Sequence, residues 1–392
     1  MSNLDHILLY CLMFVLAFIY DSLYRASLNR ANWRTHAIMQ SLPVVAFLLS
    51  LTYILTEGYR YARGVDMLGN YGPFYLHCME PAHMLSNSGL YLWITRVFYY
   101  VDITRGIFPF GSIFVFYAFI FWICLWYFYK DYRKNSVGFL LFAILANLSL
   151  TESTIRQGVS FSIVYLGLYF LERKKFLYVI GCAFAAFMIH NGNVIALVVI
   201  GFSWFCLNKK PFSWKMVVPI FIVLEYTAQF IPFTSYIQQL ISLSGLSTGE
   251  HFEGYMNTEY TDYEAEVASE WQRGVLTQLI TIAFYSSLLV IGSITQRYKK
   301  CNVYIFNAFV VGILFYEPFR LSGSFARMFM PLAALWFVPL SLGLYYRNKL
   351  NMSSKEKNLV KYCIYIVIAY IVMFYGRYVF LNPEATYVWN VI

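Results

Sequence analysis

Charged residues are scarce in this chain of 392 residues: they make up 12% of it, whereas hydrophobic residues make up 60%. Such a chain is too apolar for a soluble fold, and it indicates a membrane protein that crosses the bilayer many times. A basic segment is missing before the first apolar run, which follows Asp5, so we expect no cleavable signal peptide. The seven cysteines are scattered, and only Cys78 falls in a predicted outer segment, which excludes a disulfide on that side.

Motifs of metal and nucleotide chemistry are also missing. The sequence has no glycine-rich phosphate loop, no Asp-x-Asp pair and no His or Cys cluster at metal-binding spacing, so we expect neither a metal nor another cofactor. No internal repeat with broken helices marks a transporter. The net charge of +9 does not predict nucleic-acid binding, because 20 of the 29 Lys and Arg residues lie in six short breaks between apolar runs.

Apolar runs separated by polar breaks predict an all-α polytopic fold with about twelve transmembrane helices. The runs cover residues 6–24, 37–55, 109–129, 137–151, 157–171, 176–190, 194–207, 216–231, 275–295, 302–316, 328–346 and 362–380. The fourth to seventh runs have only about fifteen residues each, where a membrane crossing needs about twenty. Their outer turns are therefore predicted to lie below the membrane surface, where they are covered by protein or line a watery cavity.

Lysine is absent from every second break. All thirteen lysines fall in or beside six basic breaks, at residues 25–34, 130–134, 173–175, 209–215, 297–300 and 347–361. Because Lys and Arg concentrate on the cytoplasmic side, both termini are predicted to face outward. The opposite breaks carry arginine alone, at Arg60, Arg63, Arg96, Arg105, Arg156, Arg273, Arg320, Arg327 and Arg377. A guanidinium fork binds phosphate or carboxylate through two hydrogen bonds, which suggests an anionic ligand on the outer face.

We expect one integral membrane domain over residues 1–392, with two longer outer segments. Residues 56–108 include an aromatic amphipathic stretch, at about residues 90–101, that is predicted to lie flat in the membrane interface. Residues 232–274 are acidic, with Arg273 as their one Lys or Arg residue. Two interpretations of this second segment stay open, a solvated loop and a lid that gates the substrate.

Arg156 and Gln157 begin the fifth run, where an arginine at membrane depth is costly. Arg156 either anchors the helix end by pairing with Glu152 or directs its fork at a diphosphate in a recessed cavity. Gln157 would hydrogen-bond a sugar or the arginine itself.

His190 ends the sixth run and is followed by Asn191 and Asn193. The histidine either caps the helix or takes part in proton transfer and substrate orientation, because imidazole exchanges a proton near neutral pH. The two asparagines offer the amide donors and acceptors that sugar hydroxyls need.

A third outer turn holds Arg320 and Arg327. Their spacing of seven would place them on one helical face, but Pro318 and Gly323 predict that the helix is broken there. Glu317 precedes Arg320 by three residues, so an ion pair between them is the alternative to a ligand-binding role. Arg327 has no acidic residue nearby in the sequence, which makes it a candidate for phosphate binding.

The first outer segment adds acidic and aromatic candidates. Asp66 or Glu80 is a possible general base, although Asp66 would alternatively neutralise Arg63 in an ion pair. Arg60 and Tyr71 lie in the same segment and are candidates for substrate binding.

Several of these residues form short motifs whose order is informative. A Gly-x-Asp motif is followed by a tyrosine in the first large outer segment, an Arg-Gln pair opens a middle run, a histidine ends the next run, and an arginine comes late. They are Gly64, Asp66, Tyr71, Arg156, Gln157, His190 and Arg327, with Arg60 ahead of them. In this order and on this side, the chain over residues 57–340 resembles the EpsG/Wzy family of bacterial polysaccharide polymerases. Two positions depart from the family pattern: Met67 replaces an aromatic residue, and Asn191-Gly-Asn193 replaces Ser and small residues.

The resemblance implies a GT-C-like glycosyltransferase architecture in the bacterial inner membrane, with a cavity that faces the periplasm. The implied reaction joins undecaprenyl-diphosphate-linked oligosaccharide repeats of O-antigen type without a metal. Arg156, Arg327 and Arg320 would stabilise the leaving diphosphate, while His190, with Asp66 or Glu80 behind it, would be the general base. The implied partners are the lipid-linked donor and acceptor, membrane lipid, a flippase and a chain-length regulator.

Two other functions fit the same arginines. A ligase would move finished glycan from the same lipid carrier to another acceptor, and a flippase would carry the lipid-linked oligosaccharide across the membrane. Against the flippase, the ionisable groups cluster on the outer side rather than near the midplane, and repeat symmetry is not apparent. A membrane O-acyltransferase is disfavoured because no nucleophile and base lie at a recognisable spacing.

Overall fold

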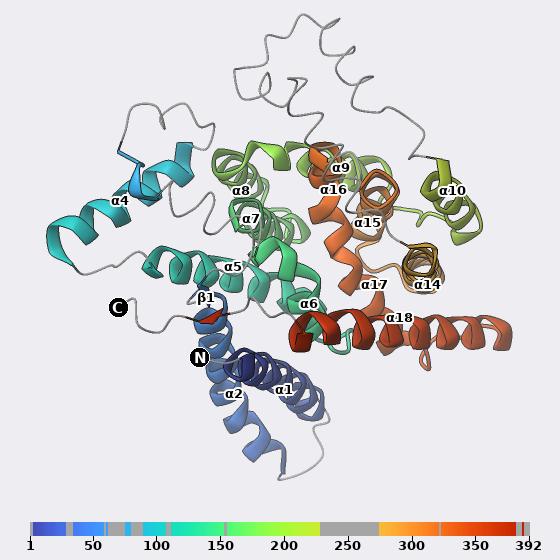
Figure 1. Ribbon diagram of the computed structural model, residues 1–392. Coiled ribbons are helices and arrows are strands. Elements are labelled where there is room, and N and C mark those ends of the chain that lie inside the picture. The colour runs from blue at the N-terminus through green and yellow to red at the C-terminus, as the bar shows by residue number, and fades with distance from the viewer. Residues whose placement is uncertain are drawn as a thin grey trace, which may run out of the picture. The chain divides into compact units, whose positions relative to one another are not determined.

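In the computed structural model, the described residues are 3–28, 34–58, 60–61, 75–79, 89–106, 111–152, 155–227, 274–320, 323–381 and 386–387. Almost all of them lie in helices or in the short turns between helices (Figure 1). The exception is a pair of two-residue strands, β1 (Arg60–Tyr61) and β2 (Thr386–Tyr387), which run antiparallel with Arg60 opposite Tyr387. The predicted all-α class is therefore confirmed for this part of the chain.

The helices form two compact units. Unit 1 comprises residues 1–193 and 371–392, and unit 2 comprises residues 194–370. The helices of unit 1 are α1 (Asn3–Ser27), α2 (Arg34–Gly58), α4 (Gly89–Arg105), α5 (Gly111–Tyr132), α6 (Phe139–Glu152), α7 (Ile155–Glu172), α8 (Phe176–Ile189) and the 3₁₀ turn η3 (Asn191–Asn193). Those of unit 2 are α9 (Val194–Cys206), α10 (Trp214–Thr227), α14 (Val275–Tyr298), α15 (Val303–Tyr316), α16 (Gly323–Ala333), η5 (Ala334–Trp336), α17 (Phe337–Tyr346) and α18 (Ser354–Leu381), whose last residues belong to unit 1.

Within the described residues each predicted apolar run is largely helical, although the run at 328–346 is divided among α16, η5 and α17. Residues 109–110 and 228–231 of two runs lie outside the described residues. Pro331 within α16 lacks the backbone N–H that would continue the hydrogen-bond ladder, and the helix passes into a 3₁₀ turn three residues later. The predicted interfacial stretch at 90–101 is helical and lies within α4. The acidic segment at 232–274 lies outside the described residues, apart from its last position.

Among the residues that the structure describes, six helices are long and apolar enough to cross a membrane. They are Ile7–Ser27, Gln40–Gly58, Ser112–Tyr132, Val275–Tyr298, Ala326–Tyr346 and Ser354–Gly376. Shorter apolar helices accompany them at Phe139–Leu148, Phe176–Ile189, Asn191–Cys206 and Val303–Tyr316. The chain is therefore a polytopic helical membrane protein, and the count of twelve crossings and the outward termini stay predictions.

In unit 1, α7 packs against α5, α6 and α8 (Figure 1). A Cβ atom on Gly158 would lie 2.3 Å from the carbonyl oxygen of Leu150, so the close approach of α7 to α6 requires glycine at this position. The Ser160 hydroxyl donates to the carbonyl of Ala186 at 2.6 Å and joins α7 to α8. These two contacts hold the first turn of α7, which carries Arg156, against its neighbours.

A buried carboxylate ties α1 to the turn before α6. Asp21 is 2% exposed, forms an ion pair with Arg25 at 2.6 Å and accepts a hydrogen bond from the backbone N–H of Gly138 at 2.8 Å. Gly138 has a φ of +67°, a backbone conformation that glycine adopts without strain. Both contacts use the Oδ2 atom of Asp21, which therefore joins α1 to the turn before α6.

In unit 2, α15 packs closely against α16, because a Cβ on Gly312 would lie 2.5 Å from the Leu332 side chain. Asn307 of α15 also organises the break between α9 and α10. Its side-chain amide donates to the carbonyls of Leu207 and Lys210, and its Oδ1 accepts from the N–H of Phe212 at 3.0 Å. One buried amide therefore satisfies three backbone groups that no helix pairs.

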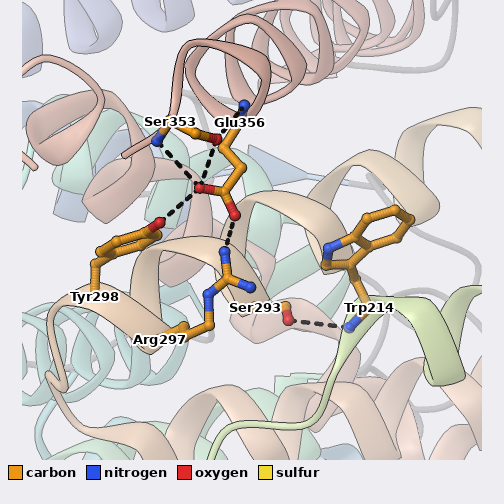
Figure 2. A network of polar contacts seen from close by, with 6 residues as sticks. All are labelled: Trp214, Ser293, Arg297, Tyr298, Ser353 and Glu356. Carbon is orange, nitrogen blue, oxygen red and sulfur yellow. Dashed lines mark hydrogen bonds and ion pairs between the residues drawn. The ribbon is translucent and has the colours of Figure 1, made fainter. Parts of the chain in front are cut away.

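The start of α18 is fastened to the end of α14 by the polar network in Figure 2. Glu356 receives hydrogen bonds from the Tyr298 hydroxyl at 2.6 Å and the Ser353 hydroxyl at 3.0 Å, and it pairs with Arg297. The N–H of Glu356 donates back to the Ser353 Oγ at 3.3 Å. Ser353 and Glu356 form a reciprocal capping box, which satisfies backbone donors at the helix N-terminus.

Replacing the capping serine, Ser353→Ala, is expected to lower the free energy of unfolding by about 1 kcal/mol, the usual effect of losing an N-cap side chain. Thermal unfolding of the detergent-solubilised protein measures the change. Ser354→Ala, one residue further along on the exposed surface, is the matched control and should leave the unfolding temperature nearly unchanged. Equal unfolding temperatures for both variants would contradict the assignment of the cap.

Candidate functional site

The predicted site residues fall into three sets. Arg156, Gln157, His190, Asn191 and Asn193 lie in unit 1, whereas Arg320, Arg327 and Glu317 lie in unit 2. Arg63, Asp66, Tyr71, Glu80 and Arg273 lie outside the described residues. For Arg60 the structure describes only the backbone, as the β1 residue opposite Tyr387.

Arg156 lies in the first turn of α7 and is partly buried. Its guanidinium carbon is 5.5 Å from the centre of the Tyr91 ring, which belongs to α4. A cation–π contact of this kind orients an arginine without adding an opposite charge. The N-terminal end of the helix dipole adds positive potential at the same place, so this turn favours an anion. The alternative partner, the Glu152 side chain, lies outside the described residues.

Gln157 and Asn193 are joined inside unit 1. The Asn193 side-chain amide donates to the backbone carbonyl of Gln157 at 3.1 Å, and both residues are buried. The Oδ1 atom of Asn193 is buried and accepts no hydrogen bond from the described residues. Asn191, at the other end of the same 3₁₀ turn, is exposed. The two asparagines therefore differ, because one holds η3 against α7 and the other faces outward.

His190 lies just after the last residue of α8, and its backbone N–H donates to the carbonyl of Ala186 at 3.0 Å. Burial, and after it the positive charge of Arg156, lowers the pKa of His190 from 6.5 to about 4. The imidazole is thus neutral at physiological pH and can accept a proton or a hydrogen bond. Gly192 leaves room for the ring, since a Cβ there would lie 3.0 Å from the His190 Cε1 atom.

In unit 2, Arg320 is held by a buried acid that precedes it by 95 residues. Its Nη1 atom lies 2.6 Å from the Oε1 atom of Glu225, in α10, and the Glu225 side chain is completely buried. The sequence predicted an ion pair with Glu317 as the structural alternative. Glu317 contributes its backbone carbonyl to Arg320 Nη1, at 3.1 Å, and its side chain is buried. The acidic partner shown by the structure is Glu225.

The predicted helix break between Arg320 and Arg327 is confirmed, because α15 ends at Tyr316 and α16 begins at Gly323. Arg327 lies in the first turn and a half of α16 and is exposed, whereas Arg320 is largely buried. Arg320 and Arg327 therefore differ in their surroundings, because a carboxylate fixes Arg320 whereas Arg327 is exposed.

Glu225 and Tyr91 were not identified from the sequence. Glu225 is the one charged residue in the apolar run at 216–231, and an ionisable residue at membrane depth signals a functional or paired group. Tyr91 carries no comparable signal, because aromatic residues make up 20% of the chain. Among the residues that the structure describes, no three His, Cys, Asp or Glu side chains gather so that they could hold a metal ion.

The structure has long apolar helices with ionisable side chains buried among them. The chain is therefore a polytopic helical membrane protein that carries arginines at helix ends. Within that class, the chain belongs to the EpsG family, the family of Wzy-like polysaccharide polymerases, whose sequence profile matches residues 43–387. Membership implies a glycosyltransferase-like polymerase of polysaccharide biosynthesis. No curated protein and no solved structure matches the chain.

The pair of Glu225 and Arg320 predicts a characteristic double-mutant cycle. Glu225→Met or Arg320→Met alone should lower the free energy of unfolding by about 3–5 kcal/mol, because each removes one partner of a buried ion pair. The double variant should lose less than the sum of the two single losses. Denaturant or thermal unfolding in detergent measures all four proteins, and additive losses would contradict a direct ion pair.

His190 predicts a pH dependence of stability with a defined sign. The unfolded chain binds a proton at His190 near pH 6.5, whereas the folded chain binds it only near pH 4. The stability that this residue contributes is therefore present above pH 6.5 and is lost as the pH falls toward 4. Thermal unfolding at pH 7 and pH 5 should show a smaller acid-induced loss in His190→Gln than in the unchanged protein. Identical losses would contradict the buried neutral imidazole.

Proposed function

We propose that this protein polymerises undecaprenyl-diphosphate-linked oligosaccharide repeats, of O-antigen type, on the outer side of the bacterial cytoplasmic membrane. Membership of the EpsG family supports the general activity, and the placement of Arg156 carries the chemical assignment. Arg156 carries a positive charge and lies at a helix N-terminus, and the face of an aromatic ring orients its guanidinium. A lipid diphosphate is the ligand whose charge and geometry fit that combination.

The reaction forms one bond and breaks another at the anomeric carbon of the growing glycan. A hydroxyl oxygen of the incoming lipid-linked repeat bonds to that carbon, and the bond from the carbon to the lipid diphosphate breaks. The leaving diphosphate takes the electron pair, so negative charge grows on its oxygens. Preorganised arginines stabilise this charge where another enzyme would use a metal ion. Arg156 has the first role, with Arg327 and Arg320 as further phosphate-binding residues.

A base must accept the proton of the acceptor hydroxyl. A neutral His190, with its lowered pKa, is suited to accept a hydrogen bond from that hydroxyl and then its proton. Asp66 and Glu80 follow it as candidates. If the transition state is dissociative, bond breaking precedes proton transfer and the base matters less than the arginines.

The remaining site residues are assigned to the sugars and the carrier. The buried Oδ1 of Asn193 and the exposed amide of Asn191 offer hydrogen bonds to sugar hydroxyls, together with Gln157. Arg60, Arg63, Tyr71, Glu80, Glu317 and Arg273 complete the proposed substrate-binding set. A flippase would supply the lipid-linked repeat, and a chain-length regulator would set when extension stops.

Arg156→Ala and Arg327→Ala are each expected to abolish chain extension in a folded protein. Lysine should restore little activity at either position, because it lacks the bidentate fork. The measurement is the length distribution of glycan in cells whose own copy of the gene is deleted and replaced by the variant. Arg173→Ala is the matched control, because Arg173, like Arg156, lies over a tyrosine ring but falls in a basic break, where it pairs with Asp131.

The control variant should give glycans of normal length. Full activity in both Arg156→Ala and Arg327→Ala would contradict the proposed role of the arginines. Full-length glycan that stays on the lipid carrier and fails to reach its final acceptor would instead indicate a ligase. Loss of all lipid-linked repeat from the outer face would indicate a flippase.

A further inference from the structure

Two segments that lie far apart in the sequence meet in unit 1. The strand β1 (Arg60–Tyr61) begins two residues after the end of α2, and β2 (Thr386–Tyr387) follows α18. The strands run antiparallel, with Arg60 opposite Tyr387 and Tyr61 opposite Thr386 (Figure 1). The pair therefore joins the start of the first outer segment to the chain that follows the last helix.

The strand β2 is an integral part of unit 1. Residues 371–392 belong to this unit, whereas the earlier part of α18 belongs to unit 2. β2 also lies against α1. The match to the EpsG family ends at residue 387, which is the last residue of β2. The pairing of β1 with β2 thus lies within the region that defines the family.

The strand pair restricts how the chain crosses the membrane. One residue separates β1 from α2, and Thr386 follows Leu381, the end of α18, by five residues. Five residues reach at most about 18 Å when fully extended, whereas the apolar core of a bilayer is about 30 Å thick. The helices α2 and α18 must therefore end on the same side of the membrane. This result agrees with the prediction that both ends face outward.

The pairing also fixes the backbone at Arg60 from a second direction. A Cβ atom on Gly58 would lie 2.6 Å from the Cα atom of Val115, so the end of α2 is in close backbone contact with α5. Two residues later the chain is held again, by β2. Two fixed points so close together determine the direction in which the backbone leaves α2.

The helix α5 connects this point to Arg156. Tyr117 of α5 stacks on Tyr91, with ring centres 5.2 Å apart and planes 13° from parallel. Tyr91 in turn lies against the guanidinium of Arg156, at 5.5 Å. α5 also packs along α7, whose first turn contains Arg156. The backbone of Arg60 and the side chain of Arg156 are therefore both positioned from α5.

A pair of two-residue strands contributes little to the stability of a protein. Even an isolated hairpin with longer strands is only marginally stable in water. Short elements of this kind open locally at a low free energy, long before the whole protein unfolds. A contact that adds little stability, but orders the backbone of a residue in the proposed substrate-binding set, suits a positioning role.

We propose that β2 is a positioning segment, which holds Arg60 in place for the lipid-linked substrate on the outer face of the membrane. The inference rests on the proposed function. Pairing with β2 orders the backbone at Arg60 before the substrate arrives, so that binding loses less conformational entropy. Loss of the pairing weakens substrate binding and leaves the chemistry at Arg156 unchanged.

The first test breaks the pairing with Thr386→Pro and Tyr387→Pro in one protein, because proline lacks the backbone N–H that a strand pair needs. Val388→Pro, one residue beyond β2, is the matched control. Each protein is reconstituted in liposomes with lipid-diphosphate-linked repeat extracted from cells that lack the polymerase. The double variant should raise KM about tenfold with little change in kcat. Its unfolding temperature should equal that of the unchanged protein, and the control should match the unchanged protein in all three measurements.

A milder variant covers the case in which the two prolines prevent folding. Thr386→Gly with Tyr387→Gly keeps both N–H groups but makes the strand more flexible, so KM should rise by a smaller factor.

The second test detects the pairing without an activity measurement. Tyr61→Cys with Thr386→Cys places two thiols at opposite positions of the pair, in a protein that also carries Cys78→Ser to prevent mispairing. This protein should form a disulfide on oxidation and keep the KM of its reduced form. Tyr61→Cys with Tyr387→Cys is the control, because successive strand residues point to opposite faces. It should form little disulfide.

An unchanged KM in the folded proline and glycine variants would overturn the positioning role. A lower unfolding temperature with unchanged KM would overturn it as well, because that result marks a purely structural contact. Equal cross-linking of the two cysteine pairs, or none in either, would overturn the pairing itself. Failure of the unchanged protein to extend the repeat would instead refute the proposed function, and the cross-linking result would still report on the pairing.

Discussion

The organising constraint in this protein is the cost of placing ionisable side chains among apolar helices. A charged group at membrane depth is tolerated only when other groups orient or neutralise it. The chain does so in two ways: Tyr91 supports Arg156 with an aromatic face, and Glu225 supports Arg320 with a buried carboxylate. Close helix packing accompanies these contacts, with Gly158 permitting the approach of α7 to α6 and Gly312 permitting the approach of α15 to α16.

The two supports have different chemical consequences. The Glu225 carboxylate, 2.6 Å away, offsets most of the positive charge of Arg320. Arg320 would therefore act on a ligand through oriented hydrogen-bond donors more than through net charge. Arg156 lies over the face of the Tyr91 ring, and its positive charge acts on its surroundings, since it helps to lower the pKa of His190. Arg156 is accordingly the stronger candidate for stabilising a leaving diphosphate, and His190 beside it is held neutral.

Much of the fold could be predicted from the sequence because membrane helices have a strong local signal. In the residues that the structure describes, the apolar runs are helical over most of their length, and Pro318 and Gly323 marked the break before α16 correctly. The contacts within the site could not be predicted in the same way. Glu225 precedes Arg320 by 95 residues, and the Tyr91 contact joins α4 to α7, so both depend on packing rather than on spacing. Local spacing instead favoured Glu317, whose backbone carbonyl contacts Arg320 while its side chain turns inward.

The most direct test of the central claim is a glycan ladder assay on the purified protein reconstituted in liposomes. The only substrate is undecaprenyl-diphosphate-linked repeat unit, and a chelator removes free divalent metals. The account predicts a ladder of products with two or more repeats, still attached to the lipid carrier. An unchanged single band from folded protein and cognate substrate would contradict a self-sufficient, arginine-based polymerase.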